Sequence, residues 1–459
     1  MTIETAIAAL KPLLGDLFST REAILTQHGQ NETYFPVTLP DAVAFPETTA
    51  EVAEIVKICA AHTCPIVAFG TGTSLEGHHL AIEGGISLDM SRMNAVLAVN
   101  TEDMDVVVQP GVTRKQLDDD LRATGLFFPV DPGADASLGG MAATRASGTT
   151  AVRYGTMKEN VLALEVVMAD GSIIRTGSRA RKSSAGYDLT KLMVGSEGTL
   201  GIITELTLRL QGQPEGISAA TCAFPDIDAA VNTVITTIQS GIPMARIELI
   251  DANMVRGFNL VDGTSLSELP HLFIEFHGST ASVAEQAAQF GDIAADFGGD
   301  DFKWTTKTEE RNALWKMRHN AYYAHKALAP RLRAMSTDIC VPISRLAEAI
   351  NFSVAKSAEL DIITTVIGHV GDGNFHCALS FDPDDTALFA RVQDFMHQLA
   401  KLAILLGGTV TGEHGIGIGK MKYMQEEHGE ALTTMRLIKR ALDPKNILNP
   451  GKILPPSNH

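Results

Sequence analysis

Cysteine is scarce in this sequence and follows no pattern that marks a structural role. The chain of 459 residues has five, an odd number, and no two of them form a Cys-x-x-Cys pair. Neither a disulfide framework nor a zinc ribbon is indicated, and a reducing compartment fits best. The five are Cys59, Cys64, Cys222, Cys340 and Cys377.

Long apolar runs are also missing. No stretch approaches the roughly 18 consecutive apolar residues of a membrane-spanning helix. Residues 1–14 lack both the apolar core of a secretory signal and the arginines of a transit peptide. We therefore expect no transmembrane segment and a cytoplasmic protein, with a peripheral position at a membrane surface left open.

Basic residues are outnumbered, and the formal net charge is −17. Nucleic acids and anionic lipid surfaces need a basic partner surface, so neither is expected to bind. A basic protein partner stays open, although an acidic excess is also common without one. The length and the ordinary apolar share of 45% predict an enzyme-sized globular chain of roughly two to four domains.

Glycine is abundant where a phosphate chain could be held. An apolar strand over 65–69 runs into Gly70, Thr71, Gly72, Thr73 and Ser74. Glycines and hydroxyls directly after a strand can wrap a pyrophosphate, because its oxygens need closely approaching N–H groups. Leu75 stands where the nicotinamide fingerprint requires glycine, which excludes a Rossmann loop. A glycine-rich turn without a ligand remains the alternative.

Two further segments of small residues follow, at 131–148 and 195–203. Such segments let a flat ring or a phosphate chain lie against the backbone. Together with the first loop they predict one extended ligand.

A polar break at 211–216 predicts the boundary between two domains. Beyond it the pattern reads strand, helix, strand, strand, helix, strand from 219 to 305, which is the split β-α-β-β-α-β arrangement. A sheet of this kind carries its helices on one face and leaves the other to cover a partner domain. Residues 430–441 read as an amphipathic helix near the C-terminus.

Two histidines flank a predicted hairpin. Asp372-Gly373 between two apolar runs is typical of a two-residue turn. Strands paired about that turn would place His369 opposite His376 on one face, with β-carbons roughly 4.5–5.5 Å apart. Two imidazoles at that separation can share one metal ion.

Glu413 and His414 lie in another glycine-rich segment, 407–419. We predict that Glu413 completes a ligand set with His369 and His376, with open positions for substrate. His414 would then be the general base. The alternative is an ordinary turn whose histidines are satisfied surface groups.

Arg318 falls between aromatic side chains at helical spacing, in a stripe with Trp315, Tyr322 and His325. An arginine there could grip a carboxylate through its forked guanidinium. An ordinary surface arginine with its stem packed against the protein is the alternative.

These motifs, in this order, resemble the FAD-linked 2-hydroxy-acid dehydrogenases of the vanillyl-alcohol oxidase and p-cresol methylhydroxylase type, most closely the branch of D-lactate dehydrogenases (cytochrome). The resemblance covers nearly the whole chain. It is carried by 70–77, 131–148, 186–189, 195–203, 337–342, 368–376, 412–415 and 449–452.

The resemblance implies an α+β protein with a p-cresol-methylhydroxylase-type FAD domain at 1–212 and a ferredoxin-like antiparallel-sheet cap at 213–439, which carries the substrate and metal sites. A tail at 440–459 would return to the flavin. It also implies that FAD is held by Gly70, Thr71, Gly72, Thr73, Ser74, Pro132, Ser137, Gly139, Gly140, Ser147, Gly148, Ile203 and Asn449.

The same resemblance implies a divalent metal, Zn or Mn, on His369, His376 and Glu413, with Arg318 on the substrate carboxylate and His414 as base. Ser336 stands where relatives acting on 2-hydroxyglutarate carry a lysine, which disfavours a dicarboxylate. His78 and His79 lie near the place where some flavoproteins of this fold bond FAD covalently, but the D-lactate branch generally does not.

The expected reaction is oxidation of D-lactate, or a similar short D-2-hydroxy acid, by hydride transfer to FAD, with a cytochrome or quinone as acceptor. A glycolate oxidase subunit, a D-2-hydroxyglutarate dehydrogenase and a non-catalytic flavin-binding scaffold remain alternatives. The sequence leaves a homodimer open.

Overall fold

The computed structural model describes residues 2–31 and 33–456, and the chain divides into two compact units. The first contains residues 1–147, 155–213 and 413–459, and the second contains 148–154 and 214–412. The chain thus enters the second unit one residue after the expected boundary. It leaves that unit at Gly412, whereas the expected cap extends to 439. Gly148, expected in the FAD domain, begins a short excursion into the second unit.

The first unit begins with a small α/β layer. Its four-stranded sheet has the order β1-β2-β4-β3, with β2, β4 and β3 parallel. A capping box between Thr48 and Glu51 starts α3. The elements are α1 (Ile3–Leu14), β1 (Phe18–Ser19), α2 (Glu22–Gly29), β2 (Ala42–Ala44), α3 (Thr49–His62), β3 (Ile66–Phe69) and β4 (Ile86–Asp89).

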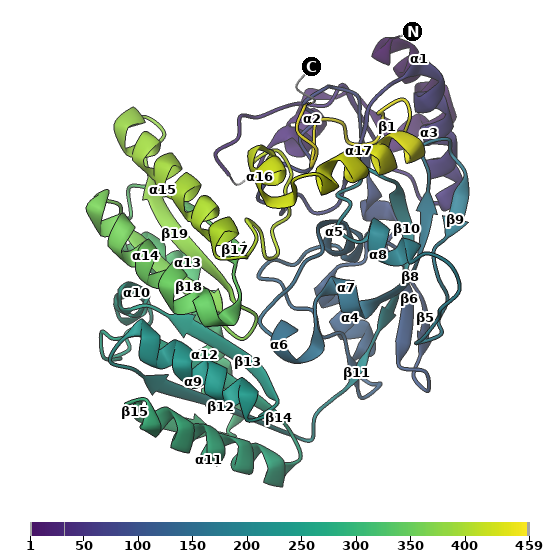
Figure 1. The fold of residues 1–459 in the computed structure, drawn as a ribbon. Helices are drawn as coiled ribbons and strands as arrows, with labels where there is room; N and C mark the ends of the chain where they lie inside the picture. Colours follow the sequence, from purple (N-terminus) through teal and green to yellow (C-terminus); the bar gives the residue numbers. More distant parts are fainter. Residues whose placement is uncertain (1, 32, 457–459) are drawn as a thin grey trace. The chain divides into compact units, whose positions relative to one another are not determined.

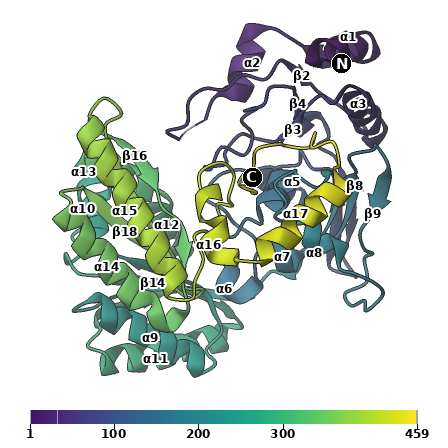
Figure 2. The same cartoon turned by 45° about the horizontal axis from the view of Figure 1, so that its top comes forward.

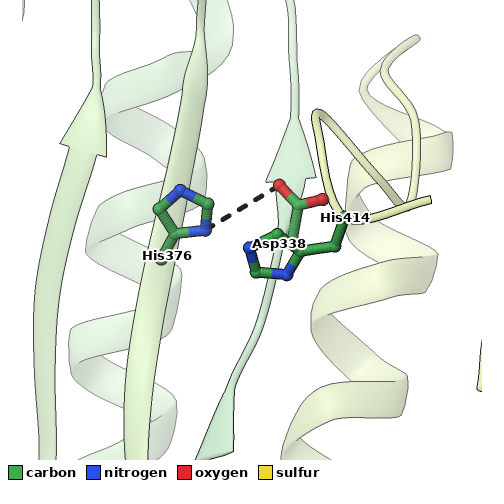
Figure 3. A group of neighbouring side chains, drawn as sticks. All are labelled: Asp338, His376 and His414. Carbon is green, nitrogen blue, oxygen red and sulfur yellow. Dashed lines mark ion pairs between the residues drawn. The ribbon is translucent and has the colours of Figure 1, made fainter. Parts of the chain in front are cut away.

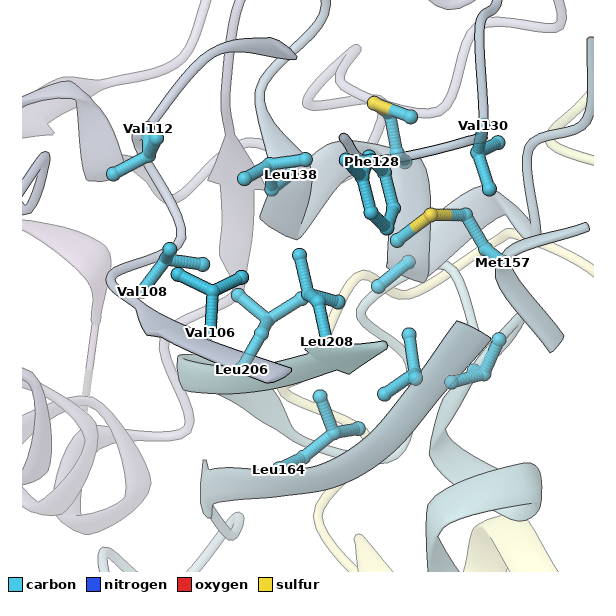
Figure 4. Packing of buried hydrophobic residues seen from close by; sticks show 14 of the residues in the cluster. Val106, Val108, Val112, Phe128, Val130, Leu138, Met157, Leu164, Leu206 and Leu208 are labelled. Atoms are coloured by element: carbon cyan, nitrogen blue, oxygen red, sulfur yellow. The ribbon is translucent and has the colours of Figure 1, made fainter. Parts of the chain in front are cut away.

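A second sheet in the same unit has the order β5-β6-β10-β8-β9 and is antiparallel throughout. Figure 4 shows Val106, Val108, Leu206 and Leu208 from its strands packed with Leu138 of α5. This core fixes the start of α5, which carries part of the expected FAD site. The elements are β5 (Val96–Asn100), β6 (Asp105–Val108), α4 (Arg114–Leu121), β7 (Leu126–Phe127), α5 (Leu138–Thr144), α7 (Met157–Asn160), β8 (Val161–Val167), β9 (Ile173–Arg175), α8 (Leu189–Met193), β10 (Ile202–Arg209) and β11 (Gln211–Gly212).

The second unit is built on an eight-stranded sheet whose main path is β15-β12-β14-β13-β18-β19-β16, with β17 also pairing β19. The first four strands of that path follow the order 4-1-3-2 of the split β-α-β-β-α-β unit, so the predicted pattern over 219–305 is confirmed, apart from one unpredicted helix between its two middle strands. Its elements are β12 (Gly216–Ala223), α9 (Ile227–Gln239), β13 (Met244–Ile250), α10 (Ala252–Asp262), β14 (His271–Gly278), α11 (Thr280–Asp296) and β15 (Asp300–Thr305).

The rest of the sheet adds a second, incomplete copy of this pattern. Its elements are α12 (Thr308–His319), α13 (Ala321–Leu328), β16 (Arg333–Ser336), β17 (Ile339–Cys340), α14 (Leu346–Glu359), β18 (Thr364–His369), β19 (Asn374–Phe381) and α15 (Thr386–Leu405). Figures 1 and 2 show α11, α9, α14 and α15 in a row along the sheet. α6 (Ala151–Tyr154), from the short excursion, packs against β13.

Helices cover both faces of this sheet, so the expected bare face is wrong. Phe276 of β14 packs on Phe290 of α11, whereas Phe273 packs on Phe258 of α10. Residues 273 and 276 point to opposite faces because side chains alternate along a strand. A core that includes Phe258, Phe273 and Trp315 joins α10, α12 and α13 to the second face.

After Gly412 the chain forms α16 (Met424–His428) and α17 (Ala431–Leu442), both in the first unit. The predicted C-terminal helix matches α17 to within a residue at each end. Short 3₁₀ turns lie at Gly15–Leu17, Met90–Arg92, Ile343–Arg345 and Met421–Tyr423. Among the helices of 2–31 and 33–456, none has the length and apolar character needed to cross a membrane.

Candidate functional site

The glycine-rich loop expected to hold a pyrophosphate follows β3 directly. A β-carbon on Gly70 would lie 2.3 Å from the Ser137 Oγ, so a larger residue at position 70 would collide with the Ser137 side chain. Ser137 in turn caps α5 by accepting a hydrogen bond from the Gly140 N–H. The first unit therefore brings the loop over 70–74 against the segment 137–140, as one extended ligand would require.

Gly139 is held just as closely. Its N–H donates to the Pro110 carbonyl at 2.9 Å, and an added β-carbon would lie 2.5 Å from the Pro110 Cβ. Ser137, Gly139, Ser147 and Gly148 are buried, while Pro132, Gly140 and Ile203 are partly exposed. Ile203 lies in β10, paired with Val166 of β8.

The C-terminal tail runs beside β3. Leu448 forms a parallel bridge with Ile66, and the Asn449 N–H donates to the Ile66 carbonyl at 2.8 Å. The Asn449 side-chain amide donates to the carbonyls of Glu197 (2.7 Å) and His78 (3.1 Å). Asn449 thus joins the tail to the segment over 195–203 and to residues on either side of the loop over 70–74, which is why its position next to a bound ligand can be proposed.

Two charged residues at this place were missed by the sequence reasoning. The Glu197 carboxylate is buried and accepts hydrogen bonds from the N–H groups of Ile416 (2.6 Å) and Gly417 (2.9 Å). The Lys452 ammonium donates to the Leu80 carbonyl and to Asn449 Oδ1, and burial lowers its pKa to about 8. Charged residues inside glycine-rich turns were the available signal, since they are rarely buried without partners.

His78 and His79 are both buried but differ in their partners. His79 uses both ring nitrogens, toward the Gln30 carbonyl at 2.8 Å and Ser74 Oγ at 3.1 Å. His78 Nε2 lies 3.4 Å from the Glu197 carboxylate, and its Nδ1 has no hydrogen-bond partner among the described residues. Of the two, His78 therefore has the nitrogen available for a further ligand.

The two histidines of the hairpin lie on one face of the sheet but not directly opposite. His369 pairs with Asn374, and Ile367 pairs with His376, because the turn spans four residues, 370–373, rather than the two expected. The histidines are therefore diagonal neighbours, with ring centroids 5.5 Å apart. The longer turn shifts the register by two residues, which preserves the shared face and corrects the predicted pairing.

Hydrogen bonds orient both imidazoles through Nδ1. His369 Nδ1 lies 2.6 Å from Glu248 Oε1, and His376 Nδ1 lies 3.0 Å from the Thr337 carbonyl. A carbonyl or carboxylate at Nδ1 places the ring proton there and leaves the Nε2 lone pair for a metal.

Asp338 lies beside His376, at 3.8 Å from its Nδ1 (Figure 3). Its carboxylate accepts hydrogen bonds from Asn374 Nδ2 at 2.8 Å and from Thr411 Oγ1 at 2.7 Å. Thr411 and Gly412 are the last residues of the second unit, so Asp338 fixes the point from which the chain continues to Glu413.

Glu413 and His414 follow Gly412 directly, and the peptide chain itself holds them next to that point. One nitrogen each of His369 and His376 and a Glu413 oxygen lie within 4.8 Å of one another. A second such group, which shares His376, contains Asp338 and His414. The predicted three-ligand set is thus brought together, and His414 lies beside it.

Arg318 lies near the C-terminal end of α12, where the predicted stripe breaks. The helix ends at His319 and α13 begins at Ala321, so Tyr322 turns outward and is 56% exposed. Arg318 therefore does not lie between two aromatic side chains, and the stripe is corrected. Instead its Nε and Nη2 lie 2.8 and 2.7 Å from Glu248 Oε2.

Glu248 is consequently shared by Arg318 and His369. Burial alone would raise the pKa of its carboxyl, but the His369 and Arg318 charges and hydrogen bonds hold that pKa below its usual value. Sequence reasoning passed over it, although a charged residue in the apolar strand β13 is a sign of a buried, paired group.

Two family models match this chain, and the second begins near the point where the chain enters the second unit, although it continues through 413–453, which the structure assigns to the first unit. A family model described as "FAD binding domain" matches residues 40–177, and one described as "FAD linked oxidases, C-terminal domain" matches 213–453. The solved structure of p-cresol methylhydroxylase with substrate bound has a TM-score of 0.81 at 19% identity and covers 98% of this chain and 96% of that one. At that identity the likeness shows the fold.

Several curated proteins are similar over almost the whole chain. "Probable D-lactate dehydrogenase, mitochondrial" of Danio rerio is 50% identical and covers 98% of this chain and 92% of its own length. "D-lactate dehydrogenase [cytochrome], mitochondrial" of Arabidopsis thaliana is 47% identical, with 98% and 80% covered. "Glycolate oxidase subunit GlcD" of Bacillus subtilis is 36% identical, with 91% and 89% covered.

Proposed function

This chain belongs to the FAD-linked oxidase family, in the branch of the D-lactate dehydrogenases of the cytochrome type, and from that premise we propose how its residues oxidise D-lactate or a similar short D-2-hydroxy acid. It is an FAD-dependent oxidoreductase of the predicted α+β fold. The product would be the 2-oxo acid.

The residues that would hold FAD are those that the first unit gathers. The loop over 70–74 and the segment 137–140 would surround the pyrophosphate, and Asn449 would close over the ligand from the tail. Gly70 supports this proposal, because a side chain there would close the space beside Ser137. Both nitrogens of His79 are engaged, which supports FAD held without a covalent bond to that residue. When bound, FAD supplies the acceptor for the substrate's C2 hydride.

His369, His376 and Glu413 would hold a divalent metal, Zn or Mn. The donor set fits, because both Nδ1 atoms are committed to acceptors and a carboxylate completes a two-histidine, one-carboxylate group. When bound, the metal lowers the pKa of the substrate hydroxyl as it does for water.

Arg318 would bind the carboxylate of the substrate. Arg318 uses its Nε and Nη2 for both contacts with Glu248, so the Nη1 side of the guanidinium remains to meet a substrate. His414 would accept the hydroxyl proton while the C2 hydride leaves with its electron pair. One proton and one hydride lost convert the alcohol to a ketone.

A short monocarboxylate is proposed over a dicarboxylate because of Ser336. The Ser336 hydroxyl donates to the Thr337 carbonyl at 2.9 Å, and this short side chain offers no charge for a second carboxylate. D-2-hydroxyglutarate, a dicarboxylate, is therefore the second candidate substrate.

The observation that carries the proposed chemistry is the pair His369 and His376, each oriented through Nδ1 toward an acceptor. The experiment is anaerobic titration of the yellow protein with D- and L-lactate, glycolate and D-2-hydroxyglutarate, followed by FAD absorbance. We expect bleaching by D-lactate at the lowest concentration. Stronger bleaching by glycolate would favour a glycolate oxidase subunit, and no bleaching by any acid would favour a flavin-binding scaffold.

The electron acceptor is proposed to be a cytochrome or a quinone, in line with the word "cytochrome" in the name of the Arabidopsis relative. Reoxidation of the bleached flavin by cytochrome c, compared with a soluble quinone, tests this. The cytoplasmic location and the homodimer remain predictions. The zebrafish and Arabidopsis relatives are named as mitochondrial, so fractionation of cells is the test of location.

A further inference from the structure

We propose that Glu248 is the positioning residue that couples the carboxylate-binding arginine to the metal-binding histidine, an inference that rests on the function proposed above. Its side chain is fully buried in the second unit, and its two oxygens are divided between two partners. Oε2 faces Arg318, at 2.8 and 2.7 Å, and Oε1 faces His369 Nδ1 at 2.6 Å.

Only a carboxylate can serve both partners at once. The guanidinium is a donor at every nitrogen, and His369 must donate from Nδ1 if its Nε2 is to bind a metal. Glu248 provides two acceptor oxygens on a single rigid group. The position of the substrate's carboxylate and the direction of the His369 lone pair are therefore fixed by the same side chain.

Glutamine at position 248 would keep the shape of the side chain but would not offer an acceptor oxygen to each partner. Its amide has one acceptor oxygen and one donor NH₂ group. Arginine cannot change its donor pattern, so the oxygen would turn to Arg318 and the NH₂ group to His369. His369 Nδ1 would then become the acceptor, its proton would move to Nε2, and the metal would lose a ligand.

The adjacent strand offers a matched control. Glu275 of β14 is also buried between a histidine and an arginine, with His277 Nε2 at 2.8 Å and Arg246 Nε at 3.6 Å. Neither partner belongs to the proposed site. Glu275→Gln therefore removes the same kind of buried charge from the same unit, and any general loss of stability should appear in both variants.

The test is the dissociation constant for Mn²⁺, used as the probe, measured by equilibrium dialysis after chelation, with FAD content and melting temperature recorded in parallel. Glu248→Gln is expected to weaken Mn²⁺ binding about 10- to 100-fold, as loss of such a partner typically does. Glu275→Gln should keep the wild-type affinity. Equal affinities for wild type and Glu248→Gln would overturn the proposal, as would an equal loss in both variants.

Glu248→Asp answers the case in which Glu248→Gln fails to fold. Aspartate keeps two acceptor oxygens but is one methylene shorter, so Mn²⁺ affinity should fall below that of wild type, but by less than the roughly 10- to 100-fold expected from loss of the partner. An unchanged affinity would count against the coupling. If the wild-type holoprotein binds no divalent cation, the proposed metal site itself is wrong. That result differs from one in which wild type and Glu248→Gln bind Mn²⁺ equally well, which would refute only the role of Glu248.

Discussion

At the scale of single residues, the ring nitrogen that carries the proton decides whether a histidine can bind a metal. Hydrogen-bond acceptors hold Nδ1 of both His369 and His376, so these rings are oriented as ligands. His414 follows Glu413, the proposed third ligand, directly in the chain and therefore lies next to the same group. The rings of His369 and His376 are oriented for metal binding, whereas His414 lies next to them. This difference is the basis for proposing His414 as the base.

His414→Ala tests that role. We expect the variant to keep its yellow FAD spectrum but to lose bleaching by D-lactate by roughly 10²–10⁴-fold, the usual value of a general base. Stopped-flow absorbance under anaerobic conditions measures this rate. His428→Ala, on α16, serves as a control with the same change of residue, and normal bleaching in the His414 variant would remove it from the mechanism.

Single residues also show where prediction from the sequence stopped. His369, His376, Glu413 and Arg318 could be named because their residue types and spacing suggest a chemistry. Glu248 and Asp338 could not, because their importance lies in contacts to residues 70 or more positions away, at Arg318 and Thr411. Only the folded chain brings those partners together, and a single sequence does not specify such long-range contacts.

At the scale of elements, local signals were reliable and turn lengths were not. The capping box at Thr48 and Glu51 was predictable because both residues act within one helical turn. The hairpin over 364–381 was also predictable, but Asp372-Gly373 suggested a two-residue turn where four residues form it. Its geometry depends on Val341, which packs on the turn from elsewhere in the chain.

Gly373→Ala tests the importance of that turn. Gly373 has φ +79°, and an added β-carbon would lie 2.0 Å from the Val341 carbonyl oxygen. We expect the free energy of unfolding to fall by more than about 2 kcal/mol, since the left-handed conformation alone costs roughly 1–2 kcal/mol. Urea unfolding measures the change, and Mn²⁺ affinity should fall with it.

The control for this turn is Gly263→Ala. Gly263 also has a positive φ, +65°, at the end of α10, but apart from its chain neighbours no described residue has an atom within 4 Å of an added β-carbon. The free energy of unfolding of Gly263→Ala should therefore fall only by the conformational cost of about 1–2 kcal/mol. Equal losses at the two positions would mean that the contact with Val341 does not constrain the hairpin.

The other end of α10 predicts a pH dependence. Asp251 caps this helix by accepting from the Met254 N–H, and burial raises its pKa to about 6. Between about pH 4 and 6 the folded protein then holds the proton more tightly than the unfolded chain, so the free energy of unfolding falls as pH rises through this window.

Asp251→Asn removes that titration and keeps a capping side chain. At pH 7 it should be more stable than wild type by up to about 3 kcal/mol, from roughly two pKa units at about 1.36 kcal/mol each. Below pH 4 the two proteins should be similar. Urea unfolding at pH 4 and pH 7 measures the difference in free energy of unfolding between the variant and wild type. An equal difference at both pH values would exclude titration of Asp251 as the cause of the pH dependence.

At the scale of the whole molecule, the order of the two units along the chain was predictable. The residues at which the chain passes from one unit to the other were harder to predict. The polar break near Pro214 marked the entry into the second unit to within a residue. The return at Glu413 was missed because the glycine-rich segment over 407–419 has no polar break. The excursion over 148–154 was missed as well, since it depends on long-range contacts such as Tyr154 with His277.

The proposed reaction uses residues of both units, because those proposed to bind FAD lie mainly in the first and those proposed to bind the substrate carboxylate lie in the second. The most direct test is anaerobic bleaching of FAD by D-lactate in protein treated with a chelator, before and after Mn²⁺ is restored. We predict that the chelated protein keeps its yellow FAD but is not bleached, and that Mn²⁺ restores bleaching. Bleaching at the full rate without the metal would contradict the account.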